Sequence, residues 1–193
     1  MGKKDRIIKC VVVGQEDVGK TCLLVTYVNG EYPAQNVPKV ANNYNKTETV
    51  DGKAYEIELL DTAGPAEFDR FRPLSYPQCD VFLVCFSVGS IDSFEVVSKK
   101  WVPEVRTHCP GVPVILVGTQ ADLRDDQGDD DDEDSFVTEK EATNMVKALD
   151  LYAYYEVSAI NQTGVKGLFE LAIKAAVESR AMNKPRKSRC SLL

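Results

Sequence analysis

The fold is decided by the stretch Ile7-Ile8-Lys9-Cys10-Val11-Val12-Val13-Gly14-Gln15-Glu16-Asp17-Val18-Gly19-Lys20-Thr21. Its apolar, β-branched first half is typical of a parallel strand covered on both faces. Its second half matches GxxxxGK[ST] and opens a segment with helical spacing over residues 20–27. In such a loop, backbone N–H groups and a helix N-terminus surround a phosphate, which Lys20 neutralises, while Thr21 binds Mg²⁺. The order strand, loop, helix predicts a phosphate site. The alternative is a chance match in a glycine-containing turn.

The rest of the chain alternates strands with helices. Residues 47–50 and 55–59 alternate polar with apolar around Asp51-Gly52, which predicts an antiparallel β-hairpin. Further strands are predicted over 81–86, 112–117 and 152–157, and further helices over 90–107, 139–149 and 164–180, with Ser90 as an N-cap. The pattern predicts an α/β fold: a mostly parallel six-stranded sheet with one antiparallel edge and helices on both faces.

Length and composition limit the organisation and the function. A chain of 193 residues fits one domain, predicted over 1–181, followed by a short tail, 182–193. The start, Met1-Gly2-Lys3, lacks an apolar secretory signal, and no apolar run reaches the ~20 residues of a membrane span, so we expect a cytosolic domain. The net charge of −7 argues against nucleic-acid binding.

The chain has six cysteines and no CxxC spacing. Several of them lie in apolar runs, where a thiol behaves as a small hydrophobe. We therefore expect five reduced thiols, and Cys190 is the exception discussed below.

Three short segments at predicted strand ends carry the remaining chemistry. Asp61-Thr62-Ala63-Gly64 follows the hairpin and offers a carboxylate to Mg²⁺ and a glycine N–H to a γ-phosphate, although alone it is also an ordinary strand-end turn. Gly118-Thr119-Gln120-Ala121-Asp122 and Ser158-Ala159 end two further strands, where open α/β sheets bind ligands. The Asp122 carboxylate can accept two hydrogen bonds from guanine, and the Ala159 N–H can donate to its carbonyl.

These segments occur in the order and spacing of small GTPases, which the chain resembles over nearly its whole length. Asp69-Arg70-Phe71-Arg72-Pro73-Leu74-Ser75-Tyr76-Pro77, Lys100-Trp101 and Asp122-Leu123-Arg124-Asp125-Asp126 are similar to the Rho family, nearest to Rac. The resemblance implies a P-loop NTPase small-GTPase domain that binds GTP or GDP with Mg²⁺ held by Thr21 and Asp61. The nucleotide-binding residues that it implies are Gly14, Gln15, Glu16, Asp17, Val18, Gly19, Lys20, Thr21, Cys22, Tyr32, Gly64, Thr119, Gln120, Asp122, Leu123, Ser158 and Ala159.

The resemblance further implies a monomer that meets effectors and exchange factors through switch regions near Asn36–Tyr44 and Gly64–Tyr76. No nucleic-acid partner is implied.

Two departures from the family pattern bear on hydrolysis. Glu16 replaces a glycine that faces the γ-phosphate and the space of an arginine finger, where it obstructs hydrolysis and repels phosphate by ~1 to 4 kcal/mol at ~4 Å. Pro65 replaces the glutamine that orients the attacking water, and proline has no side-chain amide. We expect slow hydrolysis that depends on electrostatic stabilisation by residues such as Lys20.

Two further departures bear on nucleotide contacts. Lys39 stands where the first switch usually offers a threonine to Mg²⁺, and an ammonium cannot bind a cation. Lys39 is then either a solvated loop residue or a partner of the γ-phosphate or Glu16. Gln120 replaces a lysine whose stem covers the base, a loss that Tyr32 offsets if it packs on the base edge; the alternative is a surface loop tyrosine.

The end of the chain, Cys190-Ser191-Leu192-Leu193, has the form C-a-a-X, and its terminal leucine favours geranylgeranylation of Cys190. Four basic residues precede it and supply a second signal for anionic membranes: Lys184, Arg186, Lys187 and Arg189. The alternative is a basic tail with an incidental thiol. The acidic stretch Asp125–Asp134 lies where Rho proteins have an insert, and we interpret it as a solvated loop.

The first functional hypothesis is a membrane-attached Rho/Rac-like switch in cytoskeleton-type signalling, with a cytosolic pool and weak GTP hydrolysis. The second is a nucleotide-independent interaction scaffold that keeps the fold. A metabolic P-loop kinase is a third reading, disfavoured because the chain has guanine-reading segments and a lipid site but no evident lid for a second substrate.

Overall fold

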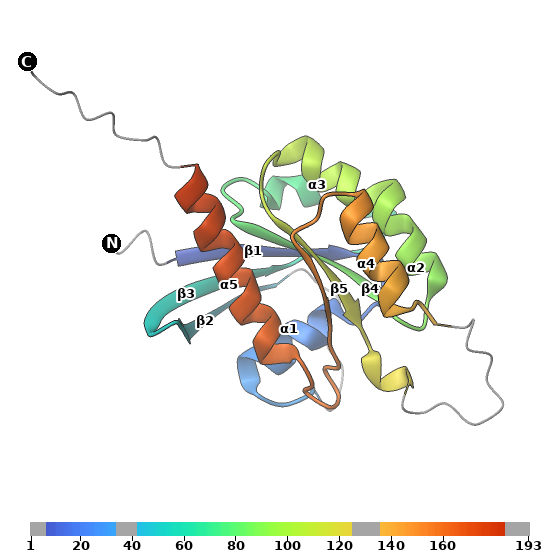
Figure 1. Ribbon diagram of the computed structural model, residues 1–193, viewed down its shortest axis with the longest axis horizontal. Helices are drawn as coiled ribbons and strands as arrows, with labels where there is room; N and C mark the ends of the chain where they lie inside the picture. Colours follow the sequence, from blue (N-terminus) through green and yellow to red (C-terminus); the bar gives the residue numbers. More distant parts are fainter. Residues whose placement is uncertain (1–6, 34–41, 125–135, 184–193) are drawn as a thin grey trace, which may run out of the picture.

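The computed structural model describes residues 7–33, 42–124 and 136–183. Lys39, the acidic stretch and Cys190 lie outside these ranges. Six strands form one sheet in the order β2-β3-β1-β4-β5-β6 (Figure 1). Their bounds are β1 Ile7–Gly14, β2 Asn43–Val50, β3 Lys53–Asp61, β4 Val81–Ser87, β5 Val114–Thr119 and β6 Ala153–Glu156. All neighbouring strands are parallel except β2 and β3, so the predicted sheet with one antiparallel edge is confirmed.

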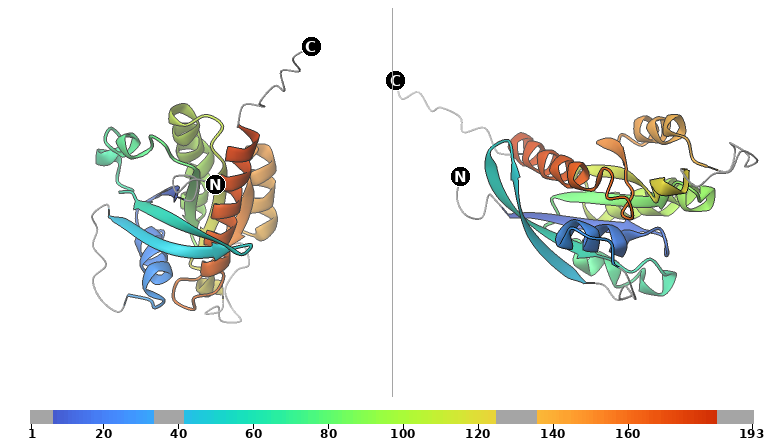
Figure 2. Two further views of the ribbon diagram at one scale, coloured as in Figure 1. Left: turned by 90° about the vertical axis from the view of Figure 1, so that its left-hand side faces the viewer. Right: turned by 90° about the horizontal axis from the view of Figure 1, so that it is seen from below.

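Helices cover both faces of this sheet (Figure 2). They are α1 Lys20–Asn29, α2 Ile91–Val96, α3 Val102–His108, α4 Glu139–Ala148 and α5 Val165–Met182. Helices α1 and α5 pack on one face, and α2, α3 and α4 pack on the other. The division follows from the strands, since alternate residues of β1 enter opposite cores.

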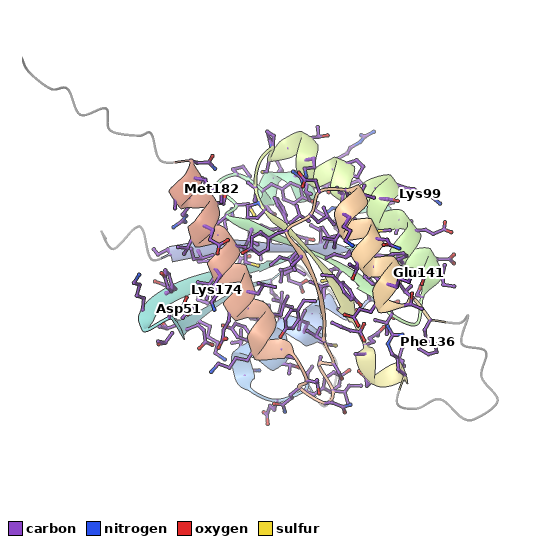
Figure 3. The ribbon with its side chains drawn as sticks, in the orientation of Figure 1. Asp51, Lys99, Phe136, Glu141, Lys174 and Met182 are labelled. Atoms are coloured by element: carbon purple, nitrogen blue, oxygen red, sulfur yellow. The ribbon has the colours of Figure 1, made fainter. Side chains whose placement is uncertain are left out.

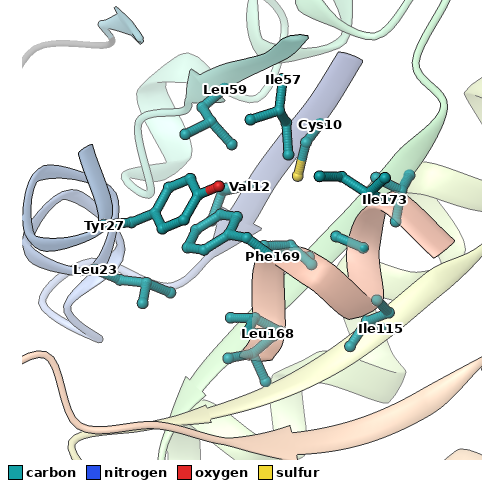
Figure 4. Close-up of a cluster of buried hydrophobic side chains, with 14 of the residues drawn as sticks. Cys10, Val12, Leu23, Tyr27, Ile57, Leu59, Ile115, Leu168, Phe169 and Ile173 are labelled. Atoms are coloured by element: carbon teal, nitrogen blue, oxygen red, sulfur yellow. The ribbon is translucent and has the colours of Figure 1, made fainter. Parts of the chain in front are cut away.

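The core under α1 and α5 is centred on two stacked rings. Tyr27 of α1 and Phe169 of α5 lie with ring centroids 3.8 Å apart, among Leu59, Cys10 and Ile173 (Figure 4). At the rim, Lys174 of α5 reaches Asp51 of the β2–β3 turn at 3.5 Å (Figure 3). This packing fixes α1, and with it the loop that precedes α1, against the sheet.

Several predicted elements differ in detail, and the hairpin strand predicted over 47–50 begins already at Asn43. The predicted helix 90–107 is interrupted by a π-helical segment, Val97–Trp101, in which the Val102 N–H donates to the Val97 carbonyl five residues earlier. Pro103, which has no N–H, follows in the first turn of α3. The predicted strand 112–117 begins only at Val114 and continues to Thr119. Helix α2 is N-capped as predicted, with Ser93 N–H donating to Ser90 Oγ over 3.2 Å.

No described helix is long and apolar enough to cross a bilayer. Within the described ranges, the five cysteines Cys10, Cys22, Cys79, Cys85 and Cys109 are free thiols.

Candidate nucleotide-binding site

The loop between β1 and α1 has the close-packed glycine backbone of a phosphate cradle. Gly14 ends β1 with φ +149°, and a Cβ built there would lie 2.3 Å from the carbonyl oxygen of Cys85. Only glycine fits this position without moving β4. The loop then enters α1 at Lys20, and the first residues of the helix, whose N–H groups have no partner within it, line the neighbouring cavity.

Lys20 lies inside this loop. Its side chain is buried, and its ammonium donates to the carbonyl oxygens of Gly14 at 2.9 Å and Gln15 at 2.6 Å. Burial lowers the pKa of Lys20, because the charged form loses hydration. The positive charge is therefore held where an anionic ligand would compensate it.

Thr21 and Asp61 bring two oxygens together beside Lys20. Thr21 Oγ1 donates to Asp61 Oδ2 over 2.5 Å, while Asp61 Oδ1 is buried and has no hydrogen-bond partner within the described part of the chain. Burial raises the pKa of Asp61. Buried polar atoms normally have partners, so an orphaned carboxylate oxygen beside a hydroxyl fits a divalent cation. These residues fit Mg²⁺, which would neutralise phosphate charge, and its remaining ligands would be water and phosphate oxygens.

The turn after Asp61 lies directly on the phosphate loop. Thr62 Oγ1 donates to the Val12 carbonyl over 2.6 Å, and a Cβ on Gly64 would lie 2.5 Å from the Glu16 nitrogen. A cavity of about 280 Å³ opens here. It is lined by Glu16, Asp17, Lys20, Thr21, Asp61, Thr62, Ala63, Gly64, Pro65, Glu67 and Phe68.

A second cavity, of about 120 Å³, lies on the other side of α1 at the carboxyl ends of β5 and β6. Eight predicted nucleotide-binding residues line it: Gly19, Cys22, Tyr32, Thr119, Gln120, Asp122, Leu123 and Ala159. Leu23, Val157 and Ile160 also line it and were not predicted. Val157 and Ile160 are apolar residues flanking Ser158-Ala159 in the sequence, and this is the signal that could have indicated them.

Asp122 in the second cavity is held by a buried hydroxyl. Ser158, 1% exposed, donates from Oγ to Asp122 Oδ1 over 2.5 Å and accepts from the Asn161 N–H over 3.0 Å. Ser158 is not one of the residues that line the cavity, and its contact with the site is the hydrogen bond to Asp122. The carboxylate thus keeps one orientation toward any base that enters.

Two side chains connect this cavity to the phosphate loop. Thr119 Oγ1 lies 2.5 Å from the Val18 carbonyl oxygen and 2.8 Å from the Phe86 carbonyl oxygen, and its one hydroxyl proton can be donated to either. Gln120, with φ +58°, reaches the Asp17 carbonyl with its amide over 3.4 Å. Gln120 therefore lies over the loop, where a Cβ built on Gly19 would be 3.8 Å from its Cγ.

A glycine-containing loop at a helix N-terminus, a hydroxyl paired with a carboxylate at a strand end and an adjoining cavity together match the arrangement of a P-loop nucleotide-binding protein. The sequence model of the Ras family matches residues 9–178, so the chain belongs to the Ras family of small GTPases. Members of this family are GTP-binding molecular switches that hold GTP or GDP with Mg²⁺ and hydrolyse GTP.

Proposed function

We propose that this chain is a Rho/Rac-like, membrane-attached switch of the Ras family whose GTP hydrolysis is slow. The observation that carries the slow hydrolysis is the lining of the cavity beside Lys20. None of its described lining residues has a carboxamide side chain, and Pro65 lies where the family has its water-orienting glutamine. Among the described lining residues, therefore, no side-chain carboxamide is available to orient water in this cavity.

The charges around the same cavity support the proposal. Among the described lining residues, Glu16, Asp17, Asp61 and Glu67 supply four carboxylates, and Lys20 supplies the one ammonium. Glu16 and Asp17 are exposed, so water screens their repulsion of phosphate to about 1 kcal/mol at ~4 Å. Mg²⁺ adds positive charge at Asp61. We therefore expect nucleotide binding to persist with reduced affinity for the triphosphate.

Assignment to the Rho/Rac branch is supported by contacts among the residues that resemble it. Asp69, Arg72, Lys100 and Trp101 come from two of the three Rho-like stretches, and each of them contacts others of the four. In the base site, Asp122 and the Ala159 N–H would read guanine. The proposed actin-cytoskeleton pathway follows from this resemblance.

Membrane attachment is proposed from the sequence of residues 184–193. A prenyl group on Cys190 and the preceding basic residues would place the domain on the cytoplasmic face of a membrane, with a cytosolic pool. Mass spectrometry of protein from a prenylating eukaryotic cell should find one geranylgeranyl group, absent from Cys190→Ser. An unmodified wild-type chain would refute the anchor.

Hydrolysis is tested by single-turnover measurement with GTP and Mg²⁺. Glu16→Gly combined with Pro65→Gln should raise the rate about tenfold or more, toward the ~10⁻⁴ s⁻¹ scale of unassisted family members. Glu16→Gly combined with Pro65→Ala is the matched control, because it restores the glycine but not the amide. A wild-type rate equal to that of the restored variant would contradict the proposal.

One observation favours a second function, a scaffold independent of nucleotide. Phe68, Phe71 and Leu74, in the segment Gly64–Tyr76, are 40%, 65% and 75% exposed. Large apolar side chains this exposed on neighbouring turns are typical of an interaction surface. Chromatography of the nucleotide released from purified protein distinguishes the two, since a scaffold would release none.

A further inference from the structure

A cluster of charged side chains joins the segment after Gly64 to helix α3. Its centre is Arg72, in the 3-10 helix Arg72–Ser75, whose side chain is 1% exposed. The Arg72 guanidinium donates to the Ala63 carbonyl over 2.8 Å and to the Glu104 carboxylate over 2.9 and 3.0 Å. It also pairs with Asp69.

The cluster is organised around one indole ring. The Arg72 guanidinium lies 4.6 Å and the Lys100 ammonium 4.7 Å from the ring centroid of Trp101. Lys100 also reaches Asp69 at 2.9 Å. Trp101 belongs to the π-helical segment that leads into α3, and it is the only tryptophan of the chain. The π segment thus presents its ring and Lys100 to the same cluster.

Glu104 holds Arg72 from the α3 side. Burial opposes ionisation of Glu104, but hydrogen bonds from Arg72 and Tyr76 outweigh it and lower the pKa of its carboxyl group. Glu104 is therefore an anion at neutral pH, and its two oxygens match the guanidinium fork. A lysine at position 72 would keep the charge but lose this bidentate geometry.

The hydrogen bond from Arg72 to the Ala63 carbonyl connects the cluster to the candidate nucleotide-binding site. Ala63 belongs to the turn that follows Asp61 and accepts the hydrogen bond from Arg72. On one side of it, Thr62 donates to the Val12 carbonyl, and on the other, Gly64 packs against the backbone of Glu16. We propose that Arg72, oriented by Glu104, is a positioning residue that holds the Asp61–Gly64 turn on the phosphate loop through the Ala63 carbonyl. Retention of nucleotide by Mg²⁺ then depends on helix α3. The inference rests on the nucleotide binding assigned to the family.

The test measures nucleotide release with and without Mg²⁺. The full chain is loaded with GDP that carries a fluorescent group on its ribose, and release is followed after addition of excess GDP, in Mg²⁺ or in a chelator. Arg72→Lys and Glu104→Gln each remove a charge-assisted hydrogen bond from the cluster, so both should release GDP about tenfold faster in Mg²⁺. In the chelator, release should stay within about twofold of wild type, because the turn acts on nucleotide through the metal.

Glu95→Gln is the matched control. It also removes a carboxylate from an ion pair, with Lys99 at 2.5 Å, but both side chains of this pair are exposed. Lys99 lies at the outer edge of the molecule (Figure 3). Such a pair contributes little, so release should stay within about twofold of wild type in both conditions.

Trp101 provides a second readout. Chelation of Mg²⁺ should change its emission in the wild-type GDP complex, and the change should be less than about half as large in Glu104→Gln. Faster release by the variants in both conditions, or unchanged release in Mg²⁺, would overturn the inference. If Arg72→Lys does not fold, Glu104→Gln carries the test. A wild-type chain that retains no GDP in Mg²⁺ would overturn nucleotide binding itself, and the inference with it.

Discussion

Replacement of Ser158 by alanine should weaken binding of guanine nucleotides while the fold persists. The Ser158 hydroxyl is buried and donates to Asp122 over 2.5 Å, so no water can take its place without rearrangement. A hydrogen bond to a charged group is worth about 1.5–3 kcal/mol, and about 1.4 kcal/mol corresponds to tenfold in affinity. Loss of the orienting bond should therefore reduce GDP affinity about 10- to 150-fold.

Calorimetry with GDP and with inosine diphosphate in Mg²⁺ measures this effect. Inosine diphosphate lacks the exocyclic amine of guanine, so an oriented Asp122 can accept only one of its two hydrogen bonds. The preference for GDP over inosine diphosphate should fall in Ser158→Ala. Ser98→Ala, which removes a hydroxyl that donates to the Glu95 carbonyl at 3.1 Å, is the control and should leave both affinities unchanged. GDP affinity within twofold of wild type in Ser158→Ala would refute the assigned role of this hydroxyl.

Three further substitutions test the charges and the core. Asp61→Asn should stabilise the metal-free protein by on the order of 1 kcal/mol, because it removes a buried charge that has an oxygen without a hydrogen-bond partner. The same substitution should abolish the stabilisation of the protein by Mg²⁺. Denaturation with and without a chelator measures both effects. Glu104→Gln should have a lower free energy of unfolding than wild type at pH 7. This difference should shrink as the pH falls below about 4.3, because folding lowers the pKa of the Glu104 carboxyl and protonation removes its stabilising contribution. Urea titrations at pH 7 and in acid report the difference. Phe169→Ala should cost about 3–5 kcal/mol, measured as a lower urea midpoint at unchanged slope, because it removes the ring stacked on Tyr27.

Much of the fold followed from local sequence patterns. The alternation of apolar strands with helical segments predicted all six strands and the antiparallel hairpin, because side-chain periodicity reports burial directly. The interruption at Val97–Trp101 was not predicted, since the apolar residues keep a helical spacing across it. The sequence also misplaced the start of β5, which begins at Val114 and not at residue 112.

The sequence likewise predicted some residues of the candidate site and missed others. Sequence placed Lys20, Thr21, Asp61 and Asp122 near the ligand, because strand ends in a parallel sheet meet at one edge. The departures at Glu16 and Pro65 were also readable, and their consequences for hydrolysis stay predictions. The remaining lining residues of the base cavity were only partly readable: Ile160 follows Ser158-Ala159 directly in the sequence, whereas Leu23 carries no signal that separates a cavity wall from a core.

By itself, then, the sequence determined the order of the elements, the phosphate-binding loop and the chemistry at each strand end, all of which depend on neighbouring residues. Only the tertiary structure decided that Ser158 orients Asp122 and that Arg72 joins Ala63 to Glu104. Those contacts link residues more than 30 positions apart, or on different elements. They depend on how side chains pack when α3, β6 and the turns close on the sheet, which no local pattern encodes.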